Sequence, residues 1–264
     1  DVKLSGEATI NLNGEVAQLN DLQRSEMLPW RAKVQMIFQD PFSSLNPRMT
    51  VQQLIERPME LHLDLSRAER KKRVEYLLDR VGLQPEYAAR YPHEFSGGQR
   101  QRIGIARALS TKPALIIADE PVSALDVSVQ AQVINLMEEL REEFGLTYIF
   151  VAHDLAVVYH IADRIAVMYL GDVVELGPAE QVYNDPRHPY TRALLSAVPH
   201  PDPRRDTSGR IRLEGDIPSP LAKPSGCGFR TRCPIAKDSC AEEAPEWVDL
   251  GEGRSVGCPH TDEL

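Results

Sequence analysis

The sequence has 264 residues, of which 42% are hydrophobic and 26% are charged, a balance typical of a folded protein that excludes a chain disordered throughout. Its 30 Lys and Arg against 39 Asp and Glu give a formal net charge of -9, and no basic cluster offsets it, which argues against a nucleic-acid partner. No apolar run reaches the roughly 18 residues that cross a bilayer, and the first residues lack the pattern of a signal peptide. The sequence therefore predicts a soluble chain that stays in the cytoplasm.

The chain opens with β-structure. Residues 7–16 alternate around an Asn-Gly pair, which is typical of a tight hairpin turn. Apolar alternation over residues 33–38 predicts a further short strand, and the polar, proline-bearing residues 39–48 must form a loop. Gln39 opens that loop, so we predict its amide at the end of a strand.

A helical region follows, over about residues 45–105. Within it, residues 67–81 place their valines and leucines on one face and are followed by Gly82, a natural C-cap. This region is expected to form a helical subdomain.

The second half alternates strands and helices. Its apolar, β-rich runs are 114–118, 147–151 and 165–169, with a helical pattern over 129–144 between the first two. This alternation predicts an α/β fold with a mainly parallel sheet and a crossover helix, and an antiparallel hairpin at the sheet edge from residue 165 onward.

Two adjacent carboxylates, Asp119 and Glu120, end the run at 114–118. Both would lie at the carboxyl end of a buried strand, where α/β sheets bind their ligands. In nucleotide hydrolysis one carboxylate can hold hydrated Mg²⁺ and the second can orient the attacking water, because phosphoryl transfer depends on positioning and charge neutralisation. Taken alone, such a pair is more often the polar start of a surface loop.

The segment Phe-Ser-Gly-Gly-Gln-Arg-Gln-Arg at 95–102 opens a predicted helix. Ser96 can cap its N-terminus, while Gly97 and Gly98 let backbone N–H groups approach an anion at the positive end of the helix. The segment therefore predicts a phosphate contact. An isolated Ser-Gly-Gly is more often a plain loop-to-helix junction, but the full octet is much more specific.

Two further polar side chains follow predicted strands. His153 follows the run at 147–151 and could bond a γ-phosphate oxygen, and Gln39 could place its amide near Mg²⁺ or the attacking water. A lone histidine is usually structural or exposed, and a single Gln before Asp-Pro is ordinarily loop. Neither residue identifies a site by itself.

In combination, these residues resemble the nucleotide-binding domain of the ABC superfamily, a P-loop NTPase. Six elements occur in the family's order: the Q-loop at Gln39, the signature at Ser96, Gly97, Gly98 and Gln99, Walker B at 115–119, the catalytic glutamate at Glu120, the D-loop at 123–126 and the H-loop at His153. The segments 38–48 and 188–195 are further similar to the oligopeptide/dipeptide importer branch.

The resemblance implies a nucleotide-binding domain over residues 1–184 and a C-terminal extension over 185–264. In that family two such domains pair head to tail, and each ATP lies between one subunit's phosphate loop and the other's signature. By analogy, Glu120 polarises the water, Asp119 and Gln39 serve Mg²⁺, and His153 contacts the γ-phosphate. The residues assigned to ATP held by the partner are Ser96, Gly97, Gly98 and Gln99, with Asp126 linking the two sites.

The resemblance also implies partners: a second ATPase subunit of the same or another chain, two integral membrane permease subunits, and a peptide-binding protein that acts indirectly. The predicted function is ATP hydrolysis that powers import of di- or oligopeptides, with the chain bound peripherally at the cytoplasmic face of the membrane. Relatives in this branch also import nickel, glutathione or peptide antibiotics, so the cargo is not specified by this subunit.

The family's phosphate loop, Gly-x-x-x-x-Gly-Lys-Ser/Thr, does not occur in the 264 residues. We expect it, together with the aromatic residue that stacks on adenine, to precede Asp1, and the chain alone is expected to bind ATP poorly and to be inactive. The alternative is a non-hydrolysing partner subunit that lends its signature to another subunit's ATP site.

All four cysteines, Cys227, Cys233, Cys240 and Cys258, lie near the C-terminus. Their C-x5-C-x6-C-x17-C spacing lacks the tight C-x2-C of most structural zinc sites, and four thiolates on a looser loop suit an iron–sulfur cluster. Some importers of this branch carry a similar tail that holds a 4Fe-4S cluster. Unliganded thiols and a zinc site joined by His260 are the alternatives, whereas a reducing cytosol argues against disulfides.

Overall fold

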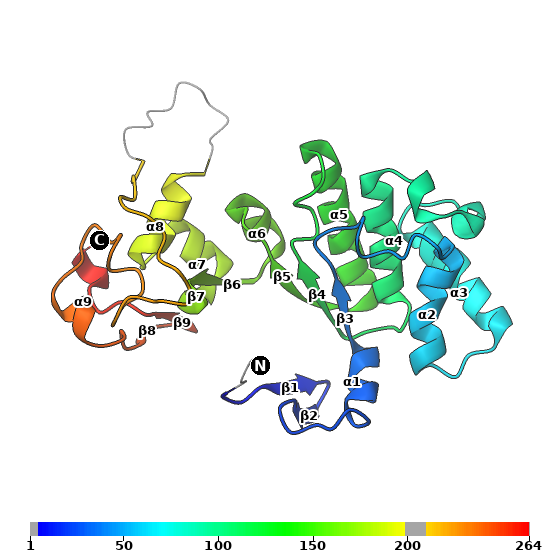
Figure 1. The fold of residues 1–264 in the computed structure, drawn as a ribbon, viewed down its shortest axis with the longest axis horizontal. Coiled ribbons are helices and arrows are strands. Elements are labelled where there is room, and N and C mark those ends of the chain that lie inside the picture. The colour runs from blue at the N-terminus through cyan, green and yellow to red at the C-terminus, as the bar shows by residue number, and fades with distance from the viewer. Residues whose placement is uncertain (1–4, 199–209, 264) are drawn as a thin grey trace. The chain divides into compact units, whose positions relative to one another are not determined.

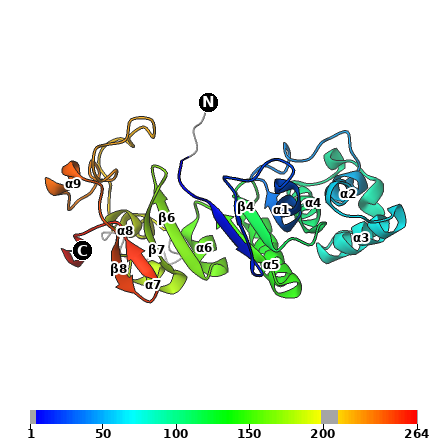
Figure 2. The same cartoon turned by 90° about the horizontal axis from the view of Figure 1, so that it is seen from below.

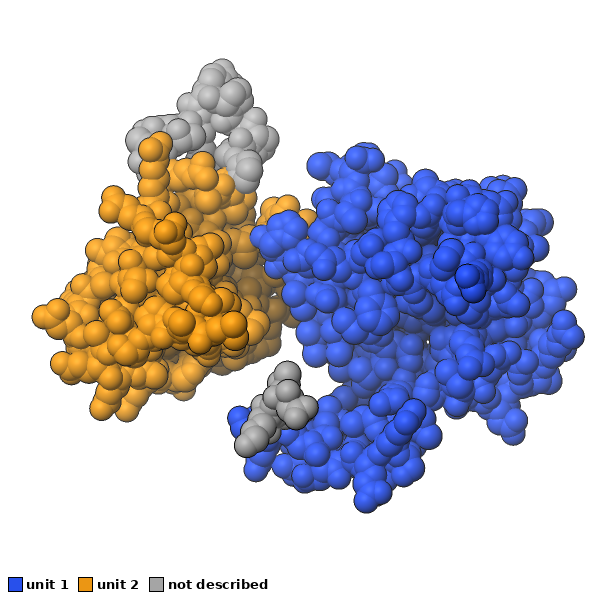
Figure 3. Space-filling view, viewed as in Figure 1, with its two compact units in different colours: residues 1–153 blue, residues 154–264 orange. Residues whose placement is uncertain are grey.

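The computed structural model describes residues 5–198 and 210–263 (Figure 1). The chain divides into two compact units, 1–153 and 154–264, each of which is described by itself (Figure 3). The predicted domains, 1–184 and 185–264, are a different division that stays a prediction, and residues 199–209 of the predicted extension lie outside the described residues.

The first unit begins with the predicted hairpin. Strand β1 (Thr9–Leu12) pairs antiparallel with β2 (Glu15–Gln18). Between them, Asn13 and Gly14 have φ values of 54° and 86°. Two consecutive positive φ values are what a two-residue hairpin turn requires, which explains the Asn-Gly pair.

A three-stranded parallel sheet forms the centre of the first unit. Helix α1 (Met27–Lys33) leads into β3 (Val34–Ile37), which pairs with β4 (Leu115–Asp119), and β4 pairs with β5 (Thr147–Val151). In register, Ile37 is opposite Ala118 and Asp119 is opposite Val151. The carboxyl ends of all three strands therefore meet at one edge, as the sequence predicts.

The predicted helical subdomain lies on one side of this sheet in both views (Figures 1 and 2). Its elements are α2 (Val51–His62), α3 (Arg67–Arg80), the 3₁₀ turns η1 (Pro85–Ala89) and η2 (Pro92–Glu94), and α4 (Gly97–Leu109). Thr50, Ser66 and Ser96 begin α2, α3 and α4 with capping boxes, which satisfy backbone N–H groups at the helix starts.

The predicted crossover helix is α5 (Val127–Phe144), which joins β4 to β5. It ends at Gly145, whose φ of 63° fits a left-handed C-cap. The buried side chains of α5 are Val133, Ile134, Leu136, Met137 and Leu140. Their spacing gives the helix one apolar face, which explains why it packs against the unit's core.

The second unit contains an antiparallel sheet. Its elements are α6 (Leu155–Ile161), β6 (Arg164–Tyr169), β7 (Asp172–Pro178), α7 (Ala179–Asn184), α8 (Pro189–Ser196), α9 (Ser239–Glu242), β8 (Val248–Gly251), β9 (Arg254–Val256) and the 3₁₀ turn η3 (Thr261–Glu263). The strand order is β6-β7-β9-β8. A small apolar core of Ile165, Val167, Ala179 and Val182 lies between β6 and α7.

The hairpin predicted from residue 165 onward is confirmed as β6 and β7. Its predicted position at the edge of the parallel sheet is wrong. Among the described residues, β6 pairs with β7 in the antiparallel sheet rather than with the parallel strands of the first unit. The second edge of β7 is taken by β9 from the end of the chain. That pairing joins segments about 80 residues apart, which local periodicity does not reveal.

None of the helices in the described part of the chain combines the length and apolar character that crossing a membrane requires.

Candidate functional site

Three parallel strands of the first unit deliver polar side chains to one edge of the sheet. Gln39 follows β3, Glu120 directly follows β4, and His153 follows β5. Nε2 of Gln39 donates to Oε2 of Glu120 at 2.8 Å, and Nδ1 of His153 lies 3.5 Å from Oε1 of the same carboxylate. The structure thus brings together the three residues that the sequence analysis assigns to catalysis.

The backbone at Glu120 is in a rare conformation. Its φ is 41°, a left-handed value that residues other than glycine seldom adopt. Its N–H donates to the carbonyl of Val151 at 2.9 Å, and the hydroxyl of Ser123 donates to its carbonyl at 3.1 Å. Such strain is typical of functional positions, because it persists only where the surrounding bonds enforce it.

The site is open to solvent. The side chain of Glu120 is 26% exposed and that of His153 is 72% exposed. Asp119 is half-buried at the end of β4, directly before Glu120. A carboxylate held between an amide and an imidazole can orient a water molecule, and a second carboxylate beside it offers a hard oxygen ligand for Mg²⁺. The pairing of Asp119 with Gln39 around one metal ion stays a prediction.

The predicted N-cap at Ser96 is confirmed. The Ser96 hydroxyl accepts the N–H of Gln99 at 3.4 Å, and the Gln99 side-chain oxygen accepts the N–H of Ser96 at 3.1 Å. This reciprocal pair fixes the start of α4. Gln99 therefore has a structural role that the sequence analysis did not assign, in addition to its predicted contact with ATP.

The two glycines of α4 differ in their surroundings. A Cβ on Gly98 would lie 2.5 Å from Cγ1 of Val129, whereas a Cβ on Gly97 would meet Leu125 at 3.5 Å, an ordinary contact. Glycine at 98 is therefore required for α4 to approach α5, a packing reason that was not anticipated. Contact of either glycine with a phosphate stays a prediction.

Asp126 directly precedes α5 and is exposed. Its carbonyl accepts the N–H groups of Val129 and Gln130, both at 2.9 Å, while its carboxylate makes no capping bond. The side chain is thus presented at the surface. Its link between two ATP sites stays a prediction.

The four cysteines of the second unit line one cavity of about 210 Å³, together with His188, Phe229 and His260. All four are free thiols. Burial, reinforced by the neighbouring thiols, raises the pKa of Cys233 to about 11, and burial also raises the pKa of Cys227 and Cys258. Among the described residues, however, no group of three or more His, Cys, Asp or Glu side chains is arranged to hold a metal ion.

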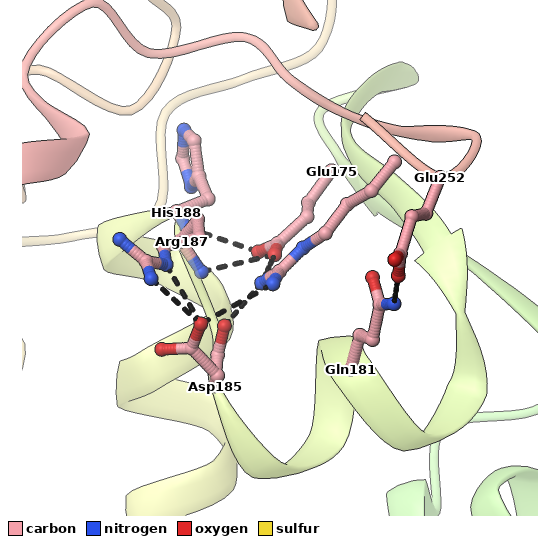
Figure 4. Close-up of polar contacts among 7 residues, drawn as sticks. Glu175, Gln181, Asp185, Arg187, His188 and Glu252 are labelled. Carbon is pink, nitrogen blue, oxygen red and sulfur yellow. Dashed lines mark hydrogen bonds and ion pairs between the residues drawn. The ribbon is translucent and has the colours of Figure 1, made fainter. Parts of the chain in front are cut away.

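A buried polar cluster lies beside that cavity, around Glu175 of β7 (Figure 4). Oε1 of Glu175 accepts the backbone N–H of Arg187 and a guanidinium N–H of Arg254, both at 2.9 Å, and Oε2 accepts the backbone N–H of His188 at 2.9 Å. Arg254 also contacts Asp185. Glu175 therefore joins β7, the start of α8 and β9, and no local motif in the sequence pointed to it.

His188 is buried at the start of α8. Its Nδ1 accepts the N–H of Tyr190 at 3.1 Å, so the neutral ring carries its proton on Nε2. Burial lowers the pKa of His188 to about 4, because the charged ring would lose its hydration. The ring thus caps the helix in its neutral form.

Comparisons with known proteins identify the family. Residues 4–123 match the ABC transporter family, and residues 174–240 match the C-terminal region of oligopeptide/dipeptide transporters. The dimeric structure of the ATP-binding cassette MJ0796 bound to ADP and Pi is similar, with a TM-score of 0.57 and 32% identity, covering 65% of this chain and 73% of that one. CbiO1 from Clostridium perfringens, part of an ABC transporter complex, also has a TM-score of 0.57, with 29% identity, 66% of this chain and 69% of its own covered.

The sequence relatives are more similar still. The putative oligopeptide transport ATP-binding protein YkfD of Bacillus subtilis is 56% identical over 91% of this chain and 74% of its own length. OppF of Escherichia coli, an oligopeptide transport ATP-binding protein, is 56% identical over 94% of this chain and 74% of its own. The di/tripeptide transport ATP-binding protein DppF of Pseudomonas aeruginosa is 51% identical over 89% and 72%. This chain therefore belongs to the ATP-binding subunits of ABC transporters, in the oligopeptide/dipeptide branch, and is an ABC-type ATPase.

Proposed function

We propose that this subunit hydrolyses ATP to power the import of di- or oligopeptides, with the reaction at the edge where β3, β4 and β5 end. One observation carries the proposal: Gln39 and His153, from two different strands, both contact the carboxylate of Glu120. The relatives named as oligopeptide and di/tripeptide transport ATP-binding proteins supply the cargo class.

In this reaction Glu120 orients the attacking water through its carboxylate, because that carboxylate is the group that both Gln39 and His153 contact. Asp119 and Gln39 would hold Mg²⁺ through their side-chain oxygens, and the ion would supply positive charge to neutralise the phosphates of bound ATP. His153 donates a hydrogen bond to the γ-phosphate. The open geometry of the edge fits this division of labour, because water and a phosphate chain must both reach Glu120.

The signature residues of this chain act in a second ATP site, the one held by the partner subunit. Ser96, Gly97, Gly98 and Gln99 stand at the N-terminus of a 13-residue helix, where the dipole and free N–H groups attract an anion. We place them on ATP held by a second ATPase subunit, identical or not, with Asp126 linking the two sites. Closure of that pair drives two integral membrane permease subunits, which receive peptide from a binding protein. The subunit is peripheral, at the cytoplasmic face of the membrane.

The substitution Glu120→Gln in the assembled transporter tests the proposal. We expect ATP binding to persist while turnover falls by about 10²–10⁴-fold, since the amide cannot act as base. Phosphate release and peptide uptake are the measurements. Glu142→Gln, an exposed carboxylate on α5, is the matched control. Unchanged turnover in Glu120→Gln would contradict the assignment and favour a subunit that only lends its signature to its partner's ATP.

For the second unit, we propose that Cys227, Cys233, Cys240 and Cys258 hold a 4Fe-4S cluster. All four line the same cavity, and Nε2 of His260, which also lines it, is buried without a hydrogen-bond partner in the described structure. Four cysteine thiolates are the usual ligand set of such a cluster. Binding would release the thiol protons, because the thiolate is the form that ligates iron.

Iron and acid-labile sulfide analysis of the anaerobically purified protein tests the cluster. We expect about four of each per chain and a brown colour. Cys233→Ser should lower both, while Ser239→Ala, at the cavity wall but without a thiol, should not. Colourless protein free of iron would contradict the cluster, and stoichiometric zinc would favour a zinc site instead.

A further inference from the structure

One face of α4 carries two arginines seven residues apart, Arg100 and Arg107, which are aligned because seven residues make about two helical turns. Both guanidinium groups contact the loop that follows Gln39. Nη1 of Arg107 donates to the carbonyl of Ser44 at 2.7 Å, and the guanidinium of Arg100 lies 4.1 Å from the ring centroid of Phe42. The loop is thus fastened to α4 at two points.

The same loop is held from within. Oδ1 of Asp40 accepts the N–H of Phe42 at 2.7 Å, and the carbonyl of Asp40 accepts the N–H of Ser44 at 3.1 Å. Leu45, at the end of this turn, is 1% exposed. A compact, anchored turn therefore begins directly after Gln39, and the position of that side chain depends on where α4 holds the turn.

The arginine contacts are specific in direction. Nε of Arg100 donates to the carbonyl of Phe95 at 3.0 Å, which orients its guanidinium over Phe42. A third arginine of α4, Arg102, also donates to a backbone carbonyl, but its acceptor is Val81 at the end of α3. Arginines of the same helix thus contact two different segments. Arg100 and Arg107 contact the loop after Gln39, which borders the catalytic edge, whereas Arg102 contacts the end of α3.

We infer that Arg100 and Arg107 are positioning residues for ATP hydrolysis, which act by holding Gln39 against Glu120. The helix that presents the signature at its N-terminus thereby also sets the Q-loop of its own subunit. The inference rests on the proposed function, since it requires Gln39 to serve Mg²⁺ or the attacking water.

Steady-state hydrolysis by the assembled transporter gives the first test. We expect Arg107→Met and Arg100→Met each to lower kcat by roughly tenfold, because a small displacement of a catalytic group is costly. The KM for ATP should change by less than about threefold, since neither arginine is assigned a contact with nucleotide. Arg73→Met, which removes an arginine that donates to the carbonyls of Leu109 and Ser110 at the far end of α4, is the matched control and should keep the kcat of the unaltered transporter. An equal loss of kcat in this variant would overturn the inference.

A double-mutant cycle separates positioning from a general structural effect. In a Gln39→Ala background, the arginine substitutions should cause no further loss of kcat, because they act through the side chain already removed. A full additional loss would overturn the inference and leave the role of Gln39 intact. Unchanged hydrolysis in Gln39→Ala alone would instead refute the proposed role of Gln39. If Arg107→Met fails to assemble, Arg100→Met and the exposed Phe42→Leu complete the same cycle.

Discussion

Two carboxylates of this molecule, Glu120 in the first unit and Glu175 in the second, are each contacted by groups from other segments of the chain. Glu120 is 26% exposed, and its partners are the side chains of Gln39 and His153. Glu175 is 0% exposed, and its partners are two backbone N–H groups and the buried guanidinium of Arg254. One carboxylate is accessible to a ligand, and the other is closed to it.

The difference shows how to tell a reactive carboxylate from a structural one. Glu120 is partly exposed, so water can replace its hydrogen-bond partners. Its contacts therefore contribute little to the free energy of unfolding. Water cannot reach Glu175 to replace its partners. If either charge of the buried pair is removed, the other keeps the cost of its lost hydration without the compensating contact. Substitution of Glu175 should therefore lower stability, whereas substitution of Glu120 should lower activity and change stability little.

The largest effect on stability is expected from Glu175→Ala, which removes the buried partner of Arg254 and leaves that guanidinium only its contacts with Asp185, whose side chain is 57% exposed. We predict a loss of about 3–5 kcal/mol in the free energy of unfolding of the second unit, measured by chemical denaturation of the whole chain. Glu120→Ala should lose less than about 1 kcal/mol. Glu252→Ala, which removes an exposed contact with Gln181, is the control on the same unit. Equal losses at positions 120 and 175 would break the comparison.

The second prediction concerns pH and His188. Burial lowers its pKa from 6.5 to about 4, so between these values the unfolded chain binds a proton that the folded chain does not. The stability contributed by the neutral ring is present above pH 6.5 and lost as the pH falls through 4, by about 3 kcal/mol. Denaturation at a series of pH values measures it. His188→Asn, which keeps a helix cap without titrating, should flatten the profile; an unchanged profile would exclude His188 as the cause.

The smallest effect compares the two glycines that begin α4. Gly98→Ala places a methyl group 2.5 Å from Val129, and we predict a loss of about 1–3 kcal/mol in the free energy of unfolding. Gly97→Ala has room for its methyl group and should be neutral in the same measurement. Hydrogen exchange at the start of α5 would locate the strain. A neutral Gly98→Ala would show that α4 and α5 are less closely packed than this structure has them.

Much of the first unit could be predicted because its information is local. The Asn-Gly turn, the capping serine at 96 and the glycine after α3 each act on neighbouring residues, and the polar residues after β3, β4 and β5 meet because parallel strands end at one edge. The convergence of Gln39, Glu120 and His153 follows from that rule.

The second unit was harder to predict because its contacts join distant segments. Strand β7 pairs with β9 from the far end of the chain. The bonded pair Glu175 and Arg254 is separated by 79 residues in the sequence. Neither residue belongs to a motif. The four cysteines were recognisable by type, yet their convergence on one cavity depends on folding of the whole tail. In the first unit, the tight contact of Gly98 with Val129 was missed for the same reason.

The most direct test of the central claim is a structure of the assembled transporter carrying Glu120→Gln with ATP and Mg²⁺ bound. The account predicts the γ-phosphate between residue 120 and His153, the ion beside Asp119 and Gln39, and the signature from Ser96 to Gln99 on the nucleotide of the partner subunit. ATP bound away from the edge formed by β3, β4 and β5, with that edge empty, would contradict it.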